Sequence, residues 1–205
     1  ASMVKWRLTL MAANGRARRC DLSTGDALAA TRGEIVRSRA EMRIHFTGIA
    51  GAGMSAVALM MRDAGHEISG SDEDVFPPMS TYVEGLGFPF HRRFDAANLP
   101  DDLDVLVLGT SAKLGAETNP EVIAARARGV RVTTFAEMLG EATRERAVTV
   151  VAGSFGKSTC TALMAHVLHQ AGANPGWMVG AISPSLPATG QWGAGEVVLE
   201  GDEYI

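Results

Sequence analysis

The sequence has little of several features that mark other classes of protein. Its two cysteines, Cys20 and Cys160, provide neither a disulfide framework nor the ligand spacing of a zinc site. No apolar run approaches the roughly 18 residues that a membrane span needs. The net charge is only −4, and the arginines of the basic N-terminal part are not interleaved with aromatic residues. We therefore expect a cytoplasmic protein with neither a membrane nor a nucleic acid as its partner.

The chain otherwise has the composition of a globular protein, with 46% hydrophobic and 20% charged residues in a length of 205. Residues 1–41 are basic, and we interpret them as an N-terminal extension or tag. From Met42 onward, apolar runs alternate with helical patterns, which is typical of an α/β protein. The pattern predicts strands at 43–47, 66–70, 104–109, 130–133, 147–152 and 196–199, a helix that ends at Gly65, and helices at 81–86, 119–128, 135–143 and 157–170.

This alternation favours a Rossmann-like, doubly wound parallel sheet over residues 42–144. The pattern restarts near Arg144, so we expect a domain boundary there. Residues 145–205 then form the start of a P-loop α/β domain that is truncated. At this length, two modest domains can each bury a core.

Residues 150–159, Val-Val-Ala-Gly-Ser-Phe-Gly-Lys-Ser-Thr, join a predicted buried strand to a predicted helix and are the most informative stretch. Glycines let backbone N–H groups approach phosphate oxygens, and a helix N-terminus favours negative charge. A lysine neutralises the outer phosphates, and a serine hydroxyl can bind Mg²⁺. The spacing is shorter than in the general phosphate loop, so an ordinary strand–helix turn is the alternative. The residues expected to hold ATP are Gly153, Ser154, Gly156, Lys157, Ser158 and Thr159.

A second glycine-rich turn, residues 48–55, follows the strand predicted at 43–47 and opens the next helix. An acid, Asp72, comes after the strand predicted at 66–70. This order places a diphosphate on a helix N-terminus and a ribose near a carboxylate. The glycines fall as G-x-x-G-x-G and not in the dinucleotide-binding order G-x-G-x-x-G. We therefore expect a ligand that contains a diphosphate but need not be NAD.

Three carboxylates follow the last predicted strand, at Glu200, Asp202 and Glu203. Mg²⁺ prefers one or two protein oxygens together with substrate phosphates. Glu200 directly follows the apolar run, so we expect it to bind Mg²⁺ together with Ser158. The alternative is a solvated acidic turn.

Taken in order, the two glycine-rich turns, the segment Gly70-Ser71-Asp72 and the acidic motif resemble the Mur ligases of peptidoglycan synthesis. The resemblance runs from about Met42 to the last residue. It implies an ATP- and Mg²⁺-dependent ligase that joins UDP-N-acetylmuramate to an amino acid or peptide through an acyl phosphate, with catalytic roles for Lys157 and Glu200. It also implies that the UDP-sugar is bound by Gly48, Ile49, Gly51, Ala52, Gly53, Met54, Ser71, Asp72, Thr110 and Ser111.

Two types of family member fit these residues. One adds L-alanine to UDP-N-acetylmuramate during synthesis, and residues 51–55 resemble it. The other joins a recovered peptide to the same sugar during recycling, and residues 71–81 and 175–180 resemble it, so we favour this type. The family's later domains do not follow within the 205 residues. We therefore expect these 205 residues to bind the UDP-sugar without completing ligation. The other classes left open are a nicotinamide-dependent oxidoreductase, a P-loop kinase and a non-catalytic UDP-sugar-binding module.

Overall fold

The structure, a computed structural model, describes residues 10–11, 17–18, 41–73, 75–109, 115 and 117–201. Contacts divide the chain into two compact units, Ala1–Ala40 and Glu41–Ile205. In the first unit, β1 (Leu10–Met11) pairs antiparallel with β2 (Ala17–Arg18). Within the described residues, no helix is both long enough and apolar enough to cross a membrane.

The second unit contains a five-stranded sheet in which every neighbouring pair is parallel. The strand order is β5-β4-β3-β6-β7, so the chain starts in the middle, moves to one edge and then builds the other. This confirms the predicted doubly wound parallel sheet. The strands are β3 (Arg43–Thr47), β4 (Glu67–Ser71), β5 (Phe90–His91), β6 (Val105–Leu108) and β7 (Arg131–Thr134).

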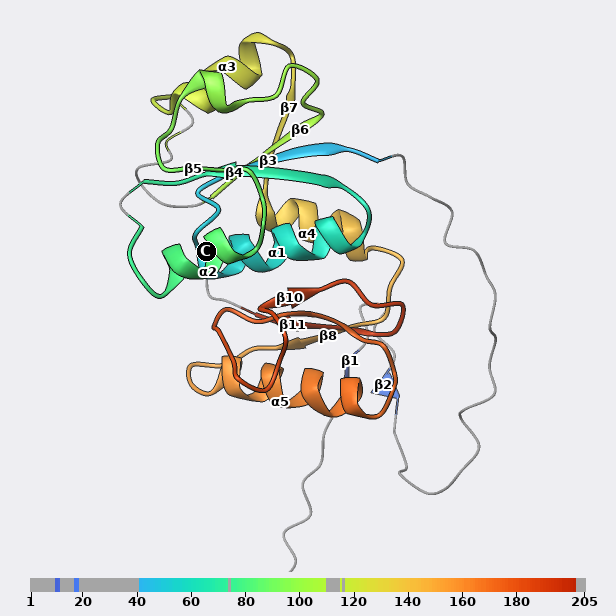
Figure 1. The fold of residues 1–205 in the computed structure, drawn as a ribbon. Coiled ribbons are helices and arrows are strands. Elements are labelled where there is room, and N and C mark those ends of the chain that lie inside the picture. Colours follow the sequence, from blue (N-terminus) through green and yellow to red (C-terminus); the bar gives the residue numbers. More distant parts are fainter. Residues whose placement is uncertain are drawn as a thin grey trace, which may run out of the picture. The chain divides into compact units, whose positions relative to one another are not determined.

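Helices cover both faces of this sheet, as Figure 1 shows. α1 (Ala52–Asp63) and α4 (Phe135–Thr143) lie together on one face, and α3 (Pro120–Ala127) lies on the other. α2 (Met79–Gly85) and the 3-10 turn η1 (Ala96–Asn98) lie on either side of β5 in the chain. Because α1 and α3 follow neighbouring strands but cover opposite faces, the chain diverges at the carboxyl ends of β3 and β6. Open α/β sheets bind their ligands at such a point.

A second sheet of four strands follows in the order β10-β9-β11-β8. β11 is parallel to β8 and β9, whereas β10 is antiparallel to β9. The strand predicted to be buried lies at an edge of this sheet: Val150 is 57% exposed, because no described strand pairs with the other side of β8. The elements of this part are β8 (Val148–Val151), α5 (Lys157–Gln170), β9 (Gly176–Met178), β10 (Gly190–Gln191) and β11 (Val197–Glu200).

The two faces of the four-stranded sheet pack against different helices. Val198 of β11 belongs to a core cluster with Ala165 of α5. Its neighbours Val197 and Leu199 instead join the large core that includes the buried residues of α1. Because side chains alternate along a strand, β11 contributes to both cores. Helix α1 therefore lies between the two sheets, in contact with β9 and β10 as well as with β4 (Figure 1).

Candidate functional site

Two helices of the second unit begin at a glycine without a side-chain cap. The N-cap of α1 is Gly51 and that of α5 is Gly156. In contrast, Asn119 caps α3, and Thr134 and Glu137 form a capping box on α4. A capped helix has its first N–H groups bonded to a side chain, whereas an uncapped one can offer them to an anion. The short helix α2 also lacks a side-chain cap, but its N-cap is Pro78, so α1 and α5 are the described helices that begin at an uncapped glycine, and both follow the glycine-rich turns.

The turn before α1 keeps its shape through hydrogen bonds to the end of β4. The N–H groups of Gly48 and Ile49 donate to the carbonyl oxygen of Ser71 at 2.8 and 3.1 Å. The N–H group of Ala50 donates to Oδ2 of Asp72 at 2.9 Å. The turn therefore uses its own amides to hold itself in place, and the helix beyond it begins with amides that no side chain caps. Those of the first turn of α1 belong to Ala52, Gly53 and Met54.

The end of β4 fits closely beneath this turn. A Cβ atom on Gly70 would lie 2.6 Å from Cδ1 of Ile49 and 2.9 Å from the carbonyl oxygen of Phe46, so only glycine fits there. The side chains of Ile49 and Met54 are buried in the core, at 0% and 5% exposure. Both residues can therefore meet a ligand through the main chain but not through the side chain.

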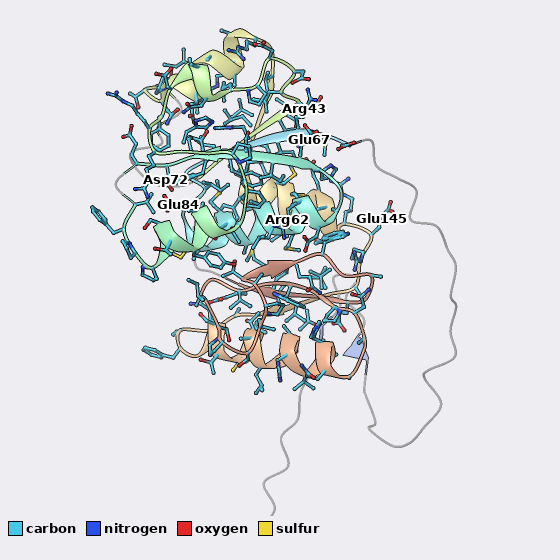
Figure 2. All side chains as sticks on the ribbon, viewed as in Figure 1. Arg43, Arg62, Glu67, Asp72, Glu84 and Glu145 are labelled. Carbon is cyan, nitrogen blue, oxygen red and sulfur yellow. The ribbon has the colours of Figure 1, made fainter. Side chains whose placement is uncertain are left out.

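The two polar residues after Gly70 differ in exposure. Ser71 is fully buried, and its hydroxyl donates to Oε2 of Glu121 at 2.6 Å, so its side chain points into the protein. Asp72 is half-buried and lies just beyond the end of β4 (Figure 2). Burial raises the pKa of Asp72, although the two backbone N–H groups that donate to its carboxylate oppose the rise. Thr110 and Ser111 lie outside the described residues.

The predicted phosphate loop joins β8 to α5. Gly153 and Gly156 have φ angles of 151° and 75°, which residues with a side chain rarely adopt. No heavy atom outside the neighbouring residues lies within 4 Å of where a Cβ of Gly156 would be. The loop is exposed to solvent, and Phe155 in it is 97% exposed. Backbone conformation, open space and an uncapped helix together suit the binding of phosphate.

Two predicted metal ligands from distant parts of the chain meet beside this loop. The hydroxyl of Ser158 donates to Oε1 of Glu200 at 2.6 Å, and the N–H group of Gly180 donates to Oε2 of Glu200 at 2.6 Å. The parallel register of β11 and β8 places Glu200 opposite Val151, the last residue of β8. Lys157 stands next to Ser158 in the first turn of α5.

The Ser158 hydroxyl and the Glu200 carboxylate limit the kind of metal ion that this site can hold. Among the residues that the structure describes, no group of three or more His, Cys, Asp and Glu side chains could hold a metal ion. One hydroxyl and one carboxylate do fit Mg²⁺, which takes few protein oxygens and completes its shell with phosphates and water. The site therefore fits a metal ion that arrives with a triphosphate.

A further connection involves residues that sequence reasoning did not single out. The hydroxyl of Tyr82 on α2 accepts a hydrogen bond from the N–H group of Thr189 at 2.9 Å. The carbonyl of Thr189 in turn accepts from the N–H group of Val179 at 2.8 Å, next to the Gly180 that holds Glu200. Helix α2, which precedes β5 of the five-stranded sheet, is thus linked through Thr189 to Val179, the neighbour of Gly180 beside the predicted phosphate loop. Tyr82 and Thr189 are 107 positions apart, so no local sequence signal could indicate this contact.

Comparison with known proteins identifies the family. The description "Mur ligase family, catalytic domain" matches residues 43–147, which is just over half of the chain. The chain belongs to the Mur ligase family. A UDP-N-acetylmuramate–L-alanine ligase of Roseiflexus is 41% identical over 165 residues, covering 80% of this chain and 34% of that protein. A UDP-N-acetylmuramate–L-alanyl-γ-D-glutamyl-meso-2,6-diaminoheptandioate ligase of Escherichia coli is 34% identical over 165 residues, covering 80% and 35%.

Solved structures of both types of Mur ligase have the same fold. The corresponding tripeptide ligase of Neisseria meningitides has a TM-score of 0.69 at 33% identity, covering 80% of this chain and 54% of that one. The alanine ligase MurC of Thermotoga maritima has a TM-score of 0.70 at 32% identity, covering 78% and 37%. The predicted family and fold are therefore confirmed. The chain spans about a third of the length of the curated relatives, and both types occur among them.

Proposed function

We propose that this chain supplies the UDP-N-acetylmuramate site and the ATP site of a ligase that joins the sugar's carboxylate to an amine. One observation supports this most strongly: α1 and α5 each begin at an uncapped glycine and each follow a glycine-rich turn. In this proposal α1 receives the diphosphate of the UDP-sugar, and α5 receives the triphosphate. The likeness to two kinds of UDP-N-acetylmuramate ligase supports the same assignment.

The reaction needs an energy donor, because an amine does not attack a carboxylate at neutral pH. Transfer of the γ-phosphoryl group of ATP to the carboxylate gives an acyl phosphate, which the amine attacks with release of phosphate. In the proposal, the Lys157 ammonium group offsets charge on the outer phosphates as it develops. Ser158 and Glu200 would hold Mg²⁺, and the ion would supply positive charge that stabilises the negative charge on the phosphates.

The first site would bind the UDP-sugar largely through main-chain groups. The amides of Ala52, Gly53 and Met54 face the diphosphate, and Asp72 lies on the side of the nucleoside. Gly48 and Ile49 shape the turn through their bonds to Ser71, which is buried. Thr110 and Ser111 stay in the proposal as contacts from a neighbouring loop, on the resemblance alone.

For the amine we propose a peptide, with L-alanine as the alternative. Residues 71–81 and 175–180 support the peptide, whereas the 41% identity with an alanine ligase supports the alternative. Because we expect these 205 residues not to complete ligation alone, the assay uses a protein that also contains the family's later domains and measures phosphate release from ATP in the presence of UDP-N-acetylmuramate. Dependence on L-alanyl-γ-D-glutamyl-meso-diaminopimelate would support the peptide, and dependence on L-alanine would overturn this choice.

Calorimetry on the 205-residue protein tests the binding proposal directly. We expect UDP-N-acetylmuramate and Mg²⁺–ATP to bind, and NAD to give no heat of binding. Lys157→Ala should abolish ATP binding and leave UDP-sugar binding unchanged. Arg144→Ala, which removes an exposed cation outside both turns, is the matched control and should change neither.

The same titrations, together with an assay of ADP release, separate the competing classes. Binding of NAD that is indifferent to Lys157→Ala would indicate an oxidoreductase. Release of ADP without any amine present would indicate a kinase. UDP-sugar binding without ATP binding would indicate a non-catalytic binding module.

A further inference from the structure

We propose that Glu121 is a positioning residue for the UDP-sugar site, because its buried carboxylate holds the strand ends from which the first turn is built. The inference rests on the function proposed above. It concerns a residue that does not itself face the ligand.

Glu121 lies in the first turn of α3 and has no exposed surface. Its Oε2 atom accepts hydrogen bonds from the hydroxyl groups of Thr47 at 2.8 Å and Ser71 at 2.6 Å. Its Oε1 atom accepts from the side-chain amide of Asn98 at 2.8 Å. One carboxylate thus joins helix α3, the ends of strands β3 and β4, and the turn η1.

The two hydroxyl donors occupy matching positions in the sheet. Thr47 and Ser71 are the last residues of β3 and β4 and stand opposite each other in the parallel register. Gly48 follows Thr47 directly, and its N–H group donates to the carbonyl oxygen of Ser71. Asp72 follows Ser71 and holds the N–H group of Ala50. Glu121 therefore fixes the two residues on which the shape of the turn depends.

A simple packing role explains these contacts less well. Burying a carboxylate is costly, and apolar residues of similar volume often stabilise a protein interior as much or more. A carboxylate instead has two oxygens that accept hydrogen bonds in defined directions. Here the donors come from different helices and strands. A second ionisable group, His45, is also fully buried, with Nε2 3.4 Å from Oε2 of Glu121 and Nδ1 2.9 Å from the hydroxyl of Ser69. The polar cluster as a whole lies behind the turn and outside the proposed chemistry.

Glu121→Gln keeps the size of the side chain but replaces one oxygen with an amide nitrogen, which cannot accept a hydrogen bond. Either the two hydroxyl groups or Asn98 then lose their acceptor. We expect the Kd of UDP-N-acetylmuramate to rise roughly tenfold, the factor that corresponds to about one lost hydrogen bond to a charged group. The Kd of Mg²⁺–ATP should not change.

Val122→Ala is the matched control for loss of stability. Val122 is the next residue of α3 and is fully buried, but it packs in a separate cluster with Leu99, Leu106 and Ala125. It should lower the melting temperature and leave the Kd of the UDP-sugar unchanged when binding is measured well below unfolding. If Glu121→Gln does not fold, Thr47→Val removes one hydroxyl donor at constant size and should weaken UDP-sugar binding in the same selective way.

The outcomes are distinct. If the wild-type protein does not bind UDP-N-acetylmuramate, the proposed function fails and this inference fails with it. If the wild type binds and the Glu121 variant, or Thr47→Val in its place, binds equally well, the inference alone is overturned. If Val122→Ala weakens UDP-sugar binding equally, or if the Glu121 variant weakens ATP binding in parallel, Glu121 has only a structural role. Either result would also overturn the inference.

Discussion

Replacing Gly190 with alanine should separate helix α1 from the second sheet. Gly190 is the first residue of β10 and is buried. A Cβ atom there would lie 2.0 Å from the carbonyl oxygen of Ala56 and 2.9 Å from its Cα. Real Cβ atoms essentially never approach other atoms closer than 3.0 Å, so α1 and β10 must move apart by about 1 Å.

The energetic cost of this movement depends on what α1 packs against on its other side. Ala56, Val57 and Ala58 of α1 are all 0% exposed, so the helix cannot retreat without disturbing the five-stranded sheet on its other side. Overpacking typically costs about 1–3 kcal/mol, and a clash with backbone atoms belongs at the upper end. For a chain of this size, about 3 kcal/mol corresponds to a fall in melting temperature of roughly 6–12 °C.

Differential scanning calorimetry of Gly190→Ala and Gly140→Ala measures this directly. Gly140 lies within helix α4, and nothing lies within 4 Å of its Cβ position. Alanine there should stabilise the helix by up to about 1 kcal/mol, since alanine has the higher helix propensity. We therefore expect the two substitutions to shift the melting temperature in opposite directions. A Gly190→Ala protein that melts with the wild type would refute the packing of α1 against β10.

Two further predictions concern polar contacts. Tyr82→Phe leaves the N–H group of the buried Thr189 without its acceptor and should lower the free energy of unfolding by about 1–3 kcal/mol; urea unfolding that matches the wild type would contradict this. The pKa of Glu121 is lowered, because burial raises it but hydrogen bonds from His45, Ser71 and Asn98 lower it by more. The unfolded chain binds this proton more readily, so the stabilisation is complete above the ordinary pKa of 4.5 and is lost as pH falls through the lowered pKa. The free energy of unfolding should fall more steeply with acid in the wild type than in Glu121→Gln, and equal slopes would count against an ionised Glu121.

Local patterns predicted much of the fold. The helix over residues 135–143 has the predicted bounds, and the strand expected at 66–70 begins and ends one residue later, at 67–71. Strands β5, β9 and β10 were not predicted, because two or three residues are too few for an alternating pattern. The edge position of β8 was also missed, since an apolar run looks the same at an edge as in the middle of a sheet.

Part of the candidate site could also be predicted from the sequence. The two glycine-rich turns were recognisable, because positive φ angles and helix starts depend on neighbouring residues. The partnership of Glu121 with Thr47 was not, because these residues are 74 positions apart. The only local sign was the Asn-Pro-Glu start of α3, which indicates a helix cap and says nothing of a buried carboxylate.

The sequence by itself determined that two glycine-containing turns followed by uncapped helices would form, since the conformations that they need depend on a few adjacent residues. Glu200 was expected near Ser158 from its place after the last strand, but only the tertiary structure decided that Glu121 stands behind the first turn and that Glu200 bonds to Ser158 beside the second. The reason is that the order and register of strands, which bring together residues 42 or 50 positions apart, are properties of the whole sheet and its packing.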